Sequence, residues 1–210
     1  MLLTNRDDLA DKVRILSLHG MDRDAWKRYM KGGSWVYDVV EVGYKCNMPD
    51  TAAALALSQL RKLPALQARR DRIAQRYLQG LGGIAGLKTA AKIPDQPDRH
   101  SWCVFAILVE EETAGISRDN LIEELKLRNI GTSVHFIPTH HFSAYQNVRK
   151  TDLRATEKIS KQIVSLPLYP GLADEDVDYI VGALRGILED SQRKHRPISK
   201  SVKQVFVSGT

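Results

Sequence analysis

The stretch that decides the fold is Trp102-Cys-Val-Phe-Ala-Ile-Leu-Val109, a run rich in β-branched and aromatic side chains. Such a run is typical of a buried strand. It is followed by Ser117, a favoured helix N-cap, and by Leu121 and Leu125, which share one face of the helix that this serine begins. Residues 132–137 read as a second strand. Strand, helix and strand in this order predict a β-α-β-like unit and an α/β fold.

Two more helices are predicted on the C-terminal side of this unit, over residues 158–164 and 174–188. The second begins with three acidic residues, which stabilise a helix when they lie at its positive, N-terminal end. Its apolar residues recur at helical spacing and form one inner face, made of Val177, Ile180, Val181 and Leu184.

On the N-terminal side, the pattern predicts a long helix over residues 49–81 that starts at Pro49. Pro64 should kink or break this helix. A cluster of glycine and proline between residues 82 and 97 marks a boundary between two regions. A shorter helix, capped by Asn5 and running to Gly20, precedes an aromatic-rich loop over residues 21–50.

The charge of the chain is concentrated at one end. The formal net charge is +6, but residues 191–210 contain five basic residues and no acidic one, so the rest of the chain carries only +1. A basic tail of this kind is predicted to be disordered and solvated, and nucleic-acid binding through it ranks last among the functions considered. The apolar runs are too short to span a bilayer. Two cysteines without a disulfide framework and the lack of a leading apolar segment favour the cytoplasm.

Four separated stretches resemble motifs of one enzyme family, the pyridoxal-phosphate (PLP) dependent sugar-nucleotide aminotransferases of the DegT/DnrJ/StrS type. They stand in the order that this family shows, and together they reach from the start of the chain to about Leu188. The stretches are Leu18-His-Gly-Met-Asp-Arg-Asp24, Gly43-Tyr-Lys-Cys-Asn-Met-Pro-Asp50, Gly131-Thr-Ser-Val-His-Phe-Ile-Pro138 and Ser165-Leu-Pro-Leu-Tyr-Pro170.

The resemblance implies the C-terminal portion of a fold-type I PLP-dependent transferase. Residues 1–48 would be the end of the large PLP-binding domain, and residues 49–81 a long interdomain helix. Residues 82–190 would then form the small C-terminal α/β domain, followed by the basic tail of residues 191–210.

The implied reaction moves an amino group from glutamate to a 4-keto sugar linked to UDP. In this family the lysine that forms the Schiff base with PLP lies shortly before the strand that residues 1–4 seem to continue. The chain by itself is therefore expected to hold no PLP and to be inactive, and no catalytic residue is assigned. Lys45 is not expected to replace that lysine, because relatives carry a lysine here as well. The alternative is a non-catalytic partner that pairs with a full-length aminotransferase.

Three residues are assigned binding roles through the resemblance. Lys45 and Asn47 lie in a loop that reaches, in this family, across a dimer interface toward the phosphate of the neighbouring subunit's cofactor. His135 falls where the family places a histidine on the substrate side. The residues alone leave other roles open: Asn47 could cap the helix at Pro49, Lys45 could be solvated, and His135 could be structural.

His140 and His141 are adjacent, and such a pair raises the question of a metal. No acidic residue or cysteine stands in register nearby, and two neighbouring histidines do not easily point at one ion. The sequence therefore predicts no metal site.

Overall fold

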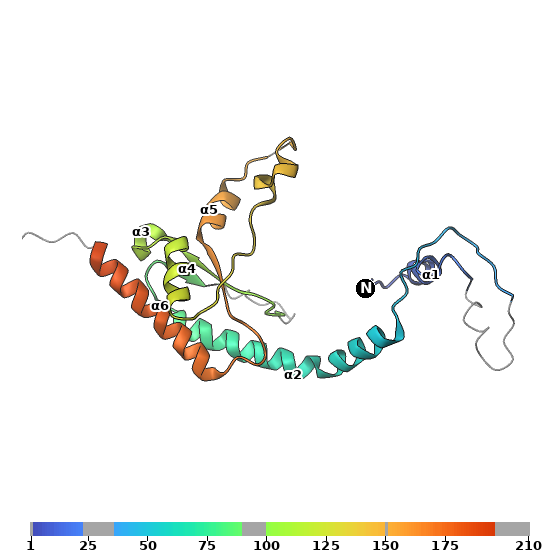
Figure 1. Ribbon diagram of the computed structural model, residues 1–210, viewed down its shortest axis with the longest axis horizontal. Helices are drawn as coiled ribbons and strands as arrows, with labels where there is room; N and C mark the ends of the chain where they lie inside the picture. The colour runs from blue at the N-terminus through green and yellow to red at the C-terminus, as the bar shows by residue number, and fades with distance from the viewer. Residues whose placement is uncertain (1, 23–35, 90–99, 150, 196–210) are drawn as a thin grey trace, which may run out of the picture. The chain divides into compact units, whose positions relative to one another are not determined.

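The computed structural model describes residues 2–22, 36–89, 100–149 and 151–195, which form two compact units (Figure 1). The first unit spans Met1–Lys62 and the second Leu63–Thr210. The boundary falls inside helix α2 (Asp50–Leu81), which is continuous through Pro64. The long helix predicted over residues 49–81 is thus present, and Pro64 does not break it.

The first unit contains helix α1 (Asp7–Leu16), the N-terminal part of α2, and irregular segments between them. The N-cap of α1 is Arg6 rather than the predicted Asn5, and the helix ends before Gly20. His19 and Gly20 both have positive φ angles, 59° and 75°, which turn the chain out of the helix. Every residue of the hydrophobic core in the described part of the chain belongs to the second unit.

The second unit is built on a three-stranded antiparallel sheet in the order β1-β2-β3, formed by Leu87–Thr89, Phe105–Val109 and Ile163–Leu166. The helices of this unit, besides the end of α2, are α3 (Glu111–Ala114), α4 (Arg118–Leu127), α5 (Arg154–Gln162) and α6 (Asp174–His195). Two 3-10 turns, η2 (Thr139–His141) and η3 (Ser143–Tyr145), lie between α4 and α5. In Figure 1 the segment with these turns and α5 projects away from the sheet.

The core lies between the sheet and the helices. Phe105, Ile107 and Val109 alternate along β2 and are almost fully buried, as expected for one face of a strand. Tyr77 of α2 packs its ring on Phe105 with centroids 4.8 Å apart. The helix predicted to begin at the Ser117 cap is confirmed as α4, and the Ser117 side chain accepts a hydrogen bond from the Asn120 amide at 3.3 Å.

One strand prediction in this unit is wrong: residues 132–137 form no strand, and only Ser133 makes a bridge, with Ser165. The helix predicted over residues 158–164 is right in part: residues 158–162 lie in α5, which begins earlier at Arg154, and residues 163–164 belong to β3. The third strand of the sheet therefore comes from the Ser165 motif, and the sheet is antiparallel rather than a β-α-β unit. In addition, α6 continues to His195, so the start of the predicted tail is helical; residues 196–210 lie outside the described residues.

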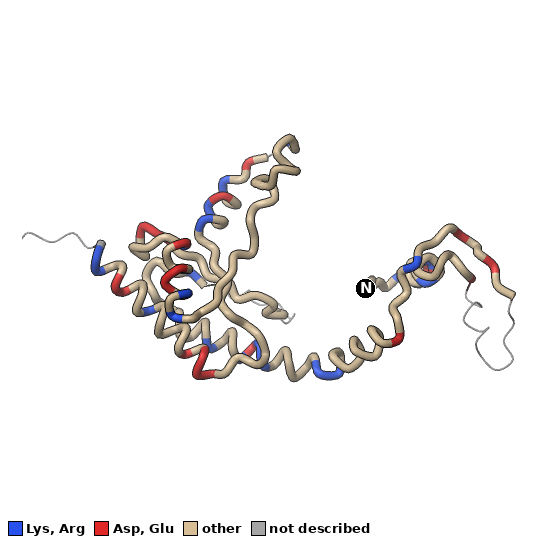
Figure 2. The backbone as a smooth tube through the Cα atoms, in the orientation of Figure 1, with Lys and Arg blue, Asp and Glu red and all other residues tan. Residues whose placement is uncertain are grey.

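Acidic and basic residues follow one another in turn along α6 (Figure 2). Three ion pairs join α6 to α2 in the described part of the chain: Arg69 contacts Asp174 at 2.5 Å, and Arg76 contacts Asp178 at 2.5 Å and Asp174 at 3.5 Å. Within the described ranges, no helix is both long enough and apolar enough to cross a membrane.

Candidate functional site

The segment with Lys45 and Asn47 is held by backbone hydrogen bonds to the end of α1. The Tyr44 amide donates to the Leu16 carbonyl at 2.7 Å, and the Cys46 amide donates to the Ser17 carbonyl at 2.9 Å. Leu18 and Lys45 thereby form an antiparallel bridge. Two of the family-like stretches, around Leu18 and around Gly43, are thus adjacent in the first unit.

Glycine is required where these two stretches cross. A Cβ on Gly43 would lie 2.2 Å from the Gly20 nitrogen, and a Cβ on Gly20 would lie 1.6 Å from the Glu41 carbonyl oxygen. Because both obstacles are backbone atoms, no side-chain movement could relieve them. This close approach fixes where the chain presents Lys45 and Asn47.

Asn47 lines a cavity of about 420 Å³ together with residues of α1 and the following turn, including Arg14, Ser17 and Asp22. Its Oδ1 atom is buried and has no hydrogen-bond partner among the described residues. The Lys45 side chain is exposed, and no hydrogen bond or ion pair of its ammonium group exists within the described ranges. The Lys45 ammonium is a donor of the kind that binds a phosphate. Asn47 could donate to a phosphate only through its Nδ2 group, because the unpartnered Oδ1 atom is an acceptor.

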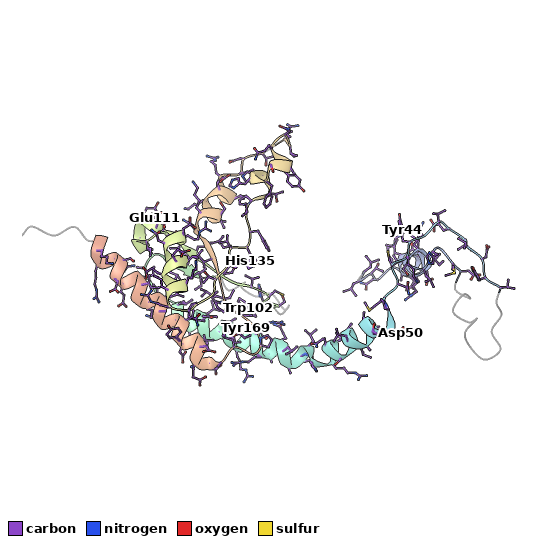
Figure 3. All side chains as sticks on the ribbon, viewed as in Figure 1. Tyr44, Asp50, Trp102, Glu111, His135 and Tyr169 are labelled. Carbon is purple, nitrogen blue, oxygen red and sulfur yellow. The ribbon has the colours of Figure 1, made fainter. Side chains whose placement is uncertain are left out.

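The second unit brings the other two family-like stretches together at His135 (Figure 3). The backbone groups of Ser133 and Ser165 exchange two hydrogen bonds, 2.7 and 3.1 Å long. The His135 Nδ1 atom lies 2.8 Å from the Ser165 hydroxyl oxygen. Ser165 is the one buried polar residue of the described part of the chain, and the histidine is the partner that satisfies its hydroxyl.

His135 opens onto a pocket of about 260 Å³ that also includes Cys103, Thr132 and Pro167. Since Nδ1 is engaged by Ser165, Nε2 is the ring atom left to bind a ligand or to hold a proton at the pocket. Pro167, which lines this pocket, is held in place by Tyr77, whose hydroxyl donates to the Pro167 carbonyl at 2.9 Å. Burial raises the pKa of Tyr77 above its ordinary value, so this hydroxyl remains a donor.

A third group of polar side chains was not expected from the sequence. The Nε2 atoms of His140 and His141 lie 2.5 and 2.9 Å from the same atom, Oε1 of Glu157 in α5. Two hydrogen bonds lower the pKa of Glu157 to about 2; the bond from His140 has the larger effect and the bond from His141 the smaller. The premise that no acidic residue stands near this histidine pair is thus wrong: an acid distant in the sequence reaches both rings.

Comparison with known proteins places these motifs in one family. The profile of the DegT/DnrJ/EryC1/StrS aminotransferase family matches residues 1–185. The chain belongs to this aminotransferase family. A similar family member is the spore coat polysaccharide biosynthesis protein SpsC of Bacillus subtilis, which is 45% identical over 193 residues. That match covers 90% of this chain and 49% of SpsC, so the chain spans about half the length of this relative.

Solved structures of family members have the same fold over the matched part. The sugar aminotransferase Spr1654 of Streptococcus pneumoniae, described as putative and in a PMP form, is 33% identical with a TM-score of 0.71, over 90% of this chain and 47% of its own. The aminotransferase TlmJ of Streptoalloteichus hindustanus is 30% identical with a TM-score of 0.72, over 89% of this chain and 46% of its own. The predicted family and α/β fold class are therefore confirmed, whereas the roles of Lys45, Asn47 and His135 stay predictions.

Proposed function

We propose that the chain is part of a PLP-dependent sugar-nucleotide aminotransferase that takes its amino group from glutamate and passes it to a 4-keto sugar. The observation that carries the proposal is the pairing of His135 with Ser165, because it joins two separated family motifs at one pocket. The family match and the exposed ammonium of Lys45 support it.

In the complete enzyme, PLP would supply the electron-withdrawing ring that amino-group transfer requires. Lys45 and Asn47 would bind the phosphate, one by charge and the other by an amide N–H. His135 would bind the sugar nucleotide through Nε2, with Ser165 fixing the orientation of its ring. None of the four family-like stretches supplies the Schiff-base lysine by resemblance, so the chain alone would have no aminotransferase activity.

We further propose that the first unit is covered by a second subunit. Its described residues contribute nothing to the hydrophobic core and expose large apolar side chains: Val42 is 91% exposed and Tyr44 69%. Exposed apolar groups of this kind mark a surface that another protein covers. The complete enzyme would be a homodimer, and this chain would pair with a full-length relative. The unpaired cysteines Cys46 and Cys103 support a reducing, cytoplasmic location.

The central test is complementation between subunits. The chain is co-expressed with full-length SpsC in which the residues matching Lys45 and Asn47 are replaced by alanine. If the loop reaches the neighbouring subunit's cofactor, the wild-type chain restores formation of 2-oxoglutarate from glutamate and a UDP-linked 4-keto sugar. The double variant Lys45→Ala/Asn47→Ala would not restore it. Lys126→Ala, which removes an exposed lysine of α4, serves as the control and would restore activity fully.

Two outcomes decide against parts of the proposal. Equal restoration by the double variant would remove the phosphate role of Lys45 and Asn47. Failure of the chain to co-purify with SpsC would remove the pairing. The inactivity of the chain alone is tested separately: after incubation with PLP and reduction with borohydride, mass spectrometry should find no PLP attached to a lysine, and an attached PLP would overturn the expectation.

A further inference from the structure

The cluster of His140, His141 and Glu157 lies outside both pockets described above. Each residue offers one ligand atom, and the three atoms all lie within 4.8 Å of one another. The His140 side chain is 17% exposed, while His141 and Glu157 are 43% and 40% exposed. The cluster is therefore preformed and open to an ion from solvent.

The local backbone explains how two adjacent histidines reach one point. They lie in the 3-10 turn η2, which is closed by hydrogen bonds from the His141 amide to Pro138 and from the Phe142 amide to Thr139. The two imidazole rings stand edge to face, with centroids 4.5 Å apart, and both direct Nε2 toward Glu157. The objection that neighbouring histidines cannot point at one ion does not hold for this turn.

The carboxylate belongs to a helix, α5, whose end is hydrogen-bonded to α4. Glu157 lies on α5, where its carbonyl accepts a hydrogen bond from the Ser160 hydroxyl at 2.9 Å. The Arg118 guanidinium, which is largely buried, donates to the carbonyls of Ser160 and Ile163 at 3.2 Å each. The end of α5 is thereby held to the start of α4, and Glu157 faces the turn from a fixed support.

We propose that His140, His141 and Glu157 bind a zinc ion. Two imidazole nitrogens and one carboxylate oxygen are a common zinc ligand set, and an exposed site leaves the fourth position to water. Zinc–ligand bonds of about 2.0–2.1 Å in a tetrahedron separate neighbouring ligand atoms by about 3.3 Å. The nitrogens lie 2.5 and 2.9 Å from the oxygen, and all three atoms lie within 4.8 Å of one another, so side-chain shifts of about 1–1.5 Å would bring them to this spacing.

The proposal assigns the ion a structural role. One ion would join the η2 turn to α5 and so close the projecting segment between them, in the way that metal ligation stabilises other loops. This consequence is independent of PLP and of the sugar nucleotide. The proposed function and the zinc site can therefore fail separately.

The test uses the whole 210-residue chain, free of affinity tags and treated with a chelator. Isothermal titration with Zn²⁺ should show one ion bound per chain, and Co²⁺ in its place should give the visible absorption of a tetrahedral site. The variants His140→Ala, His141→Ala and Glu157→Ala should each weaken zinc binding by at least about tenfold, since each removes one ligand. Mg²⁺ should not compete, because it prefers oxygen ligands.

The controls are a histidine and an acid outside the cluster, His100→Gln and Glu123→Gln. They should leave zinc binding unchanged, and circular dichroism of every variant checks that the fold is kept. If no zinc binds, the cluster is only a hydrogen-bonded group of two histidines and a carboxylate, and the proposal is wrong. Zinc binding that survives all three substitutions would place the ion elsewhere and overturn it equally.

Discussion

Gly80, near the end of α2, lies in close contact with Val181 of α6. A Cβ at this position would lie 2.8 Å from Cγ1 and 3.0 Å from Cγ2 of Val181 in α6. The carbonyl of Gly80 also accepts two hydrogen bonds from the Arg185 guanidinium, at 2.5 and 3.0 Å. Because valine has a stiff side chain, relief of the contact requires the helices to separate.

The substitution Gly80→Ala is predicted to destabilise the protein. Overpacking of this kind costs about 1–3 kcal/mol, while alanine gains at most about 1 kcal/mol over glycine in a helix. We expect a net loss of about 1–2 kcal/mol, which for a domain of this size lowers Tm by roughly 2–8 °C. Urea denaturation followed by circular dichroism measures the free energy of unfolding directly.

A double-mutant cycle identifies the contact responsible. Val181→Ala removes both methyl groups, so Gly80→Ala/Val181→Ala should be more stable than the sum of the single changes predicts, by about 1 kcal/mol or more. Gly182→Ala is the matched control, because a Cβ there meets nothing within 4 Å, and it should raise stability by about 0.5–1 kcal/mol. If the two changes add to within about 0.3 kcal/mol, the helix contact does not limit the packing and the reasoning fails.

Two further predictions concern the same unit. Tyr77→Phe removes the hydrogen bond to Pro167 and leaves that carbonyl without its partner, so unfolding should require about 1–2 kcal/mol less in urea titration; an unchanged midpoint would contradict this. The Arg76 guanidinium lowers the pKa of Asp178, so this pair stabilises the fold above the ordinary pKa of aspartate, about 3.9, and loses that effect as the pH falls through the lowered value. The stability difference between wild type and Asp178→Asn should therefore shrink between pH 7 and pH 2, and a difference that grew instead would contradict the assignment.

The elements that the sequence predicted correctly are those with local signals. The cap at Ser117 and the spacing of Leu121 and Leu125 determine α4 without reference to the rest of the chain. The acidic first turn and the apolar face of α6 do the same, and Val177 and Leu184 are fully buried as expected.

The strand pairing could not be predicted in this way. Residues 132–137 have strand-like composition, yet only Ser133 finds a partner, because β3 pairs with β2 through residues about 60 positions away. Strand β1 lies within a stretch rich in glycine and proline that reads as a boundary. The hydrophobic pattern of a short segment does not show which distant segment it pairs with.

The residues of the candidate site also divide into those with a local sequence signal and those without one. Lys45, Asn47 and His135 were identified from motifs, whose residues are contiguous. Glu157 was missed because its position on α5 has no sequence relation to the histidines of η2. Ser165, the partner of His135, directly follows the helix predicted over residues 158–164 and was given no role of its own, because nothing local in the sequence places its hydroxyl beside His135.

Because the Ser165 hydroxyl holds the imidazole of His135, the orientation of His135 depends on the register of β3 in the sheet. Ser165 pairs with Ala106 in the sheet, and its backbone also pairs with Ser133. A slip of β3 by one residue would present Val164 or Leu166 to the imidazole, and neither can form a hydrogen bond. Molecules in which β3 had slipped would therefore carry a His135 without its anchor. If His135 binds substrate as proposed, correct assembly of the sheet is a condition for that binding.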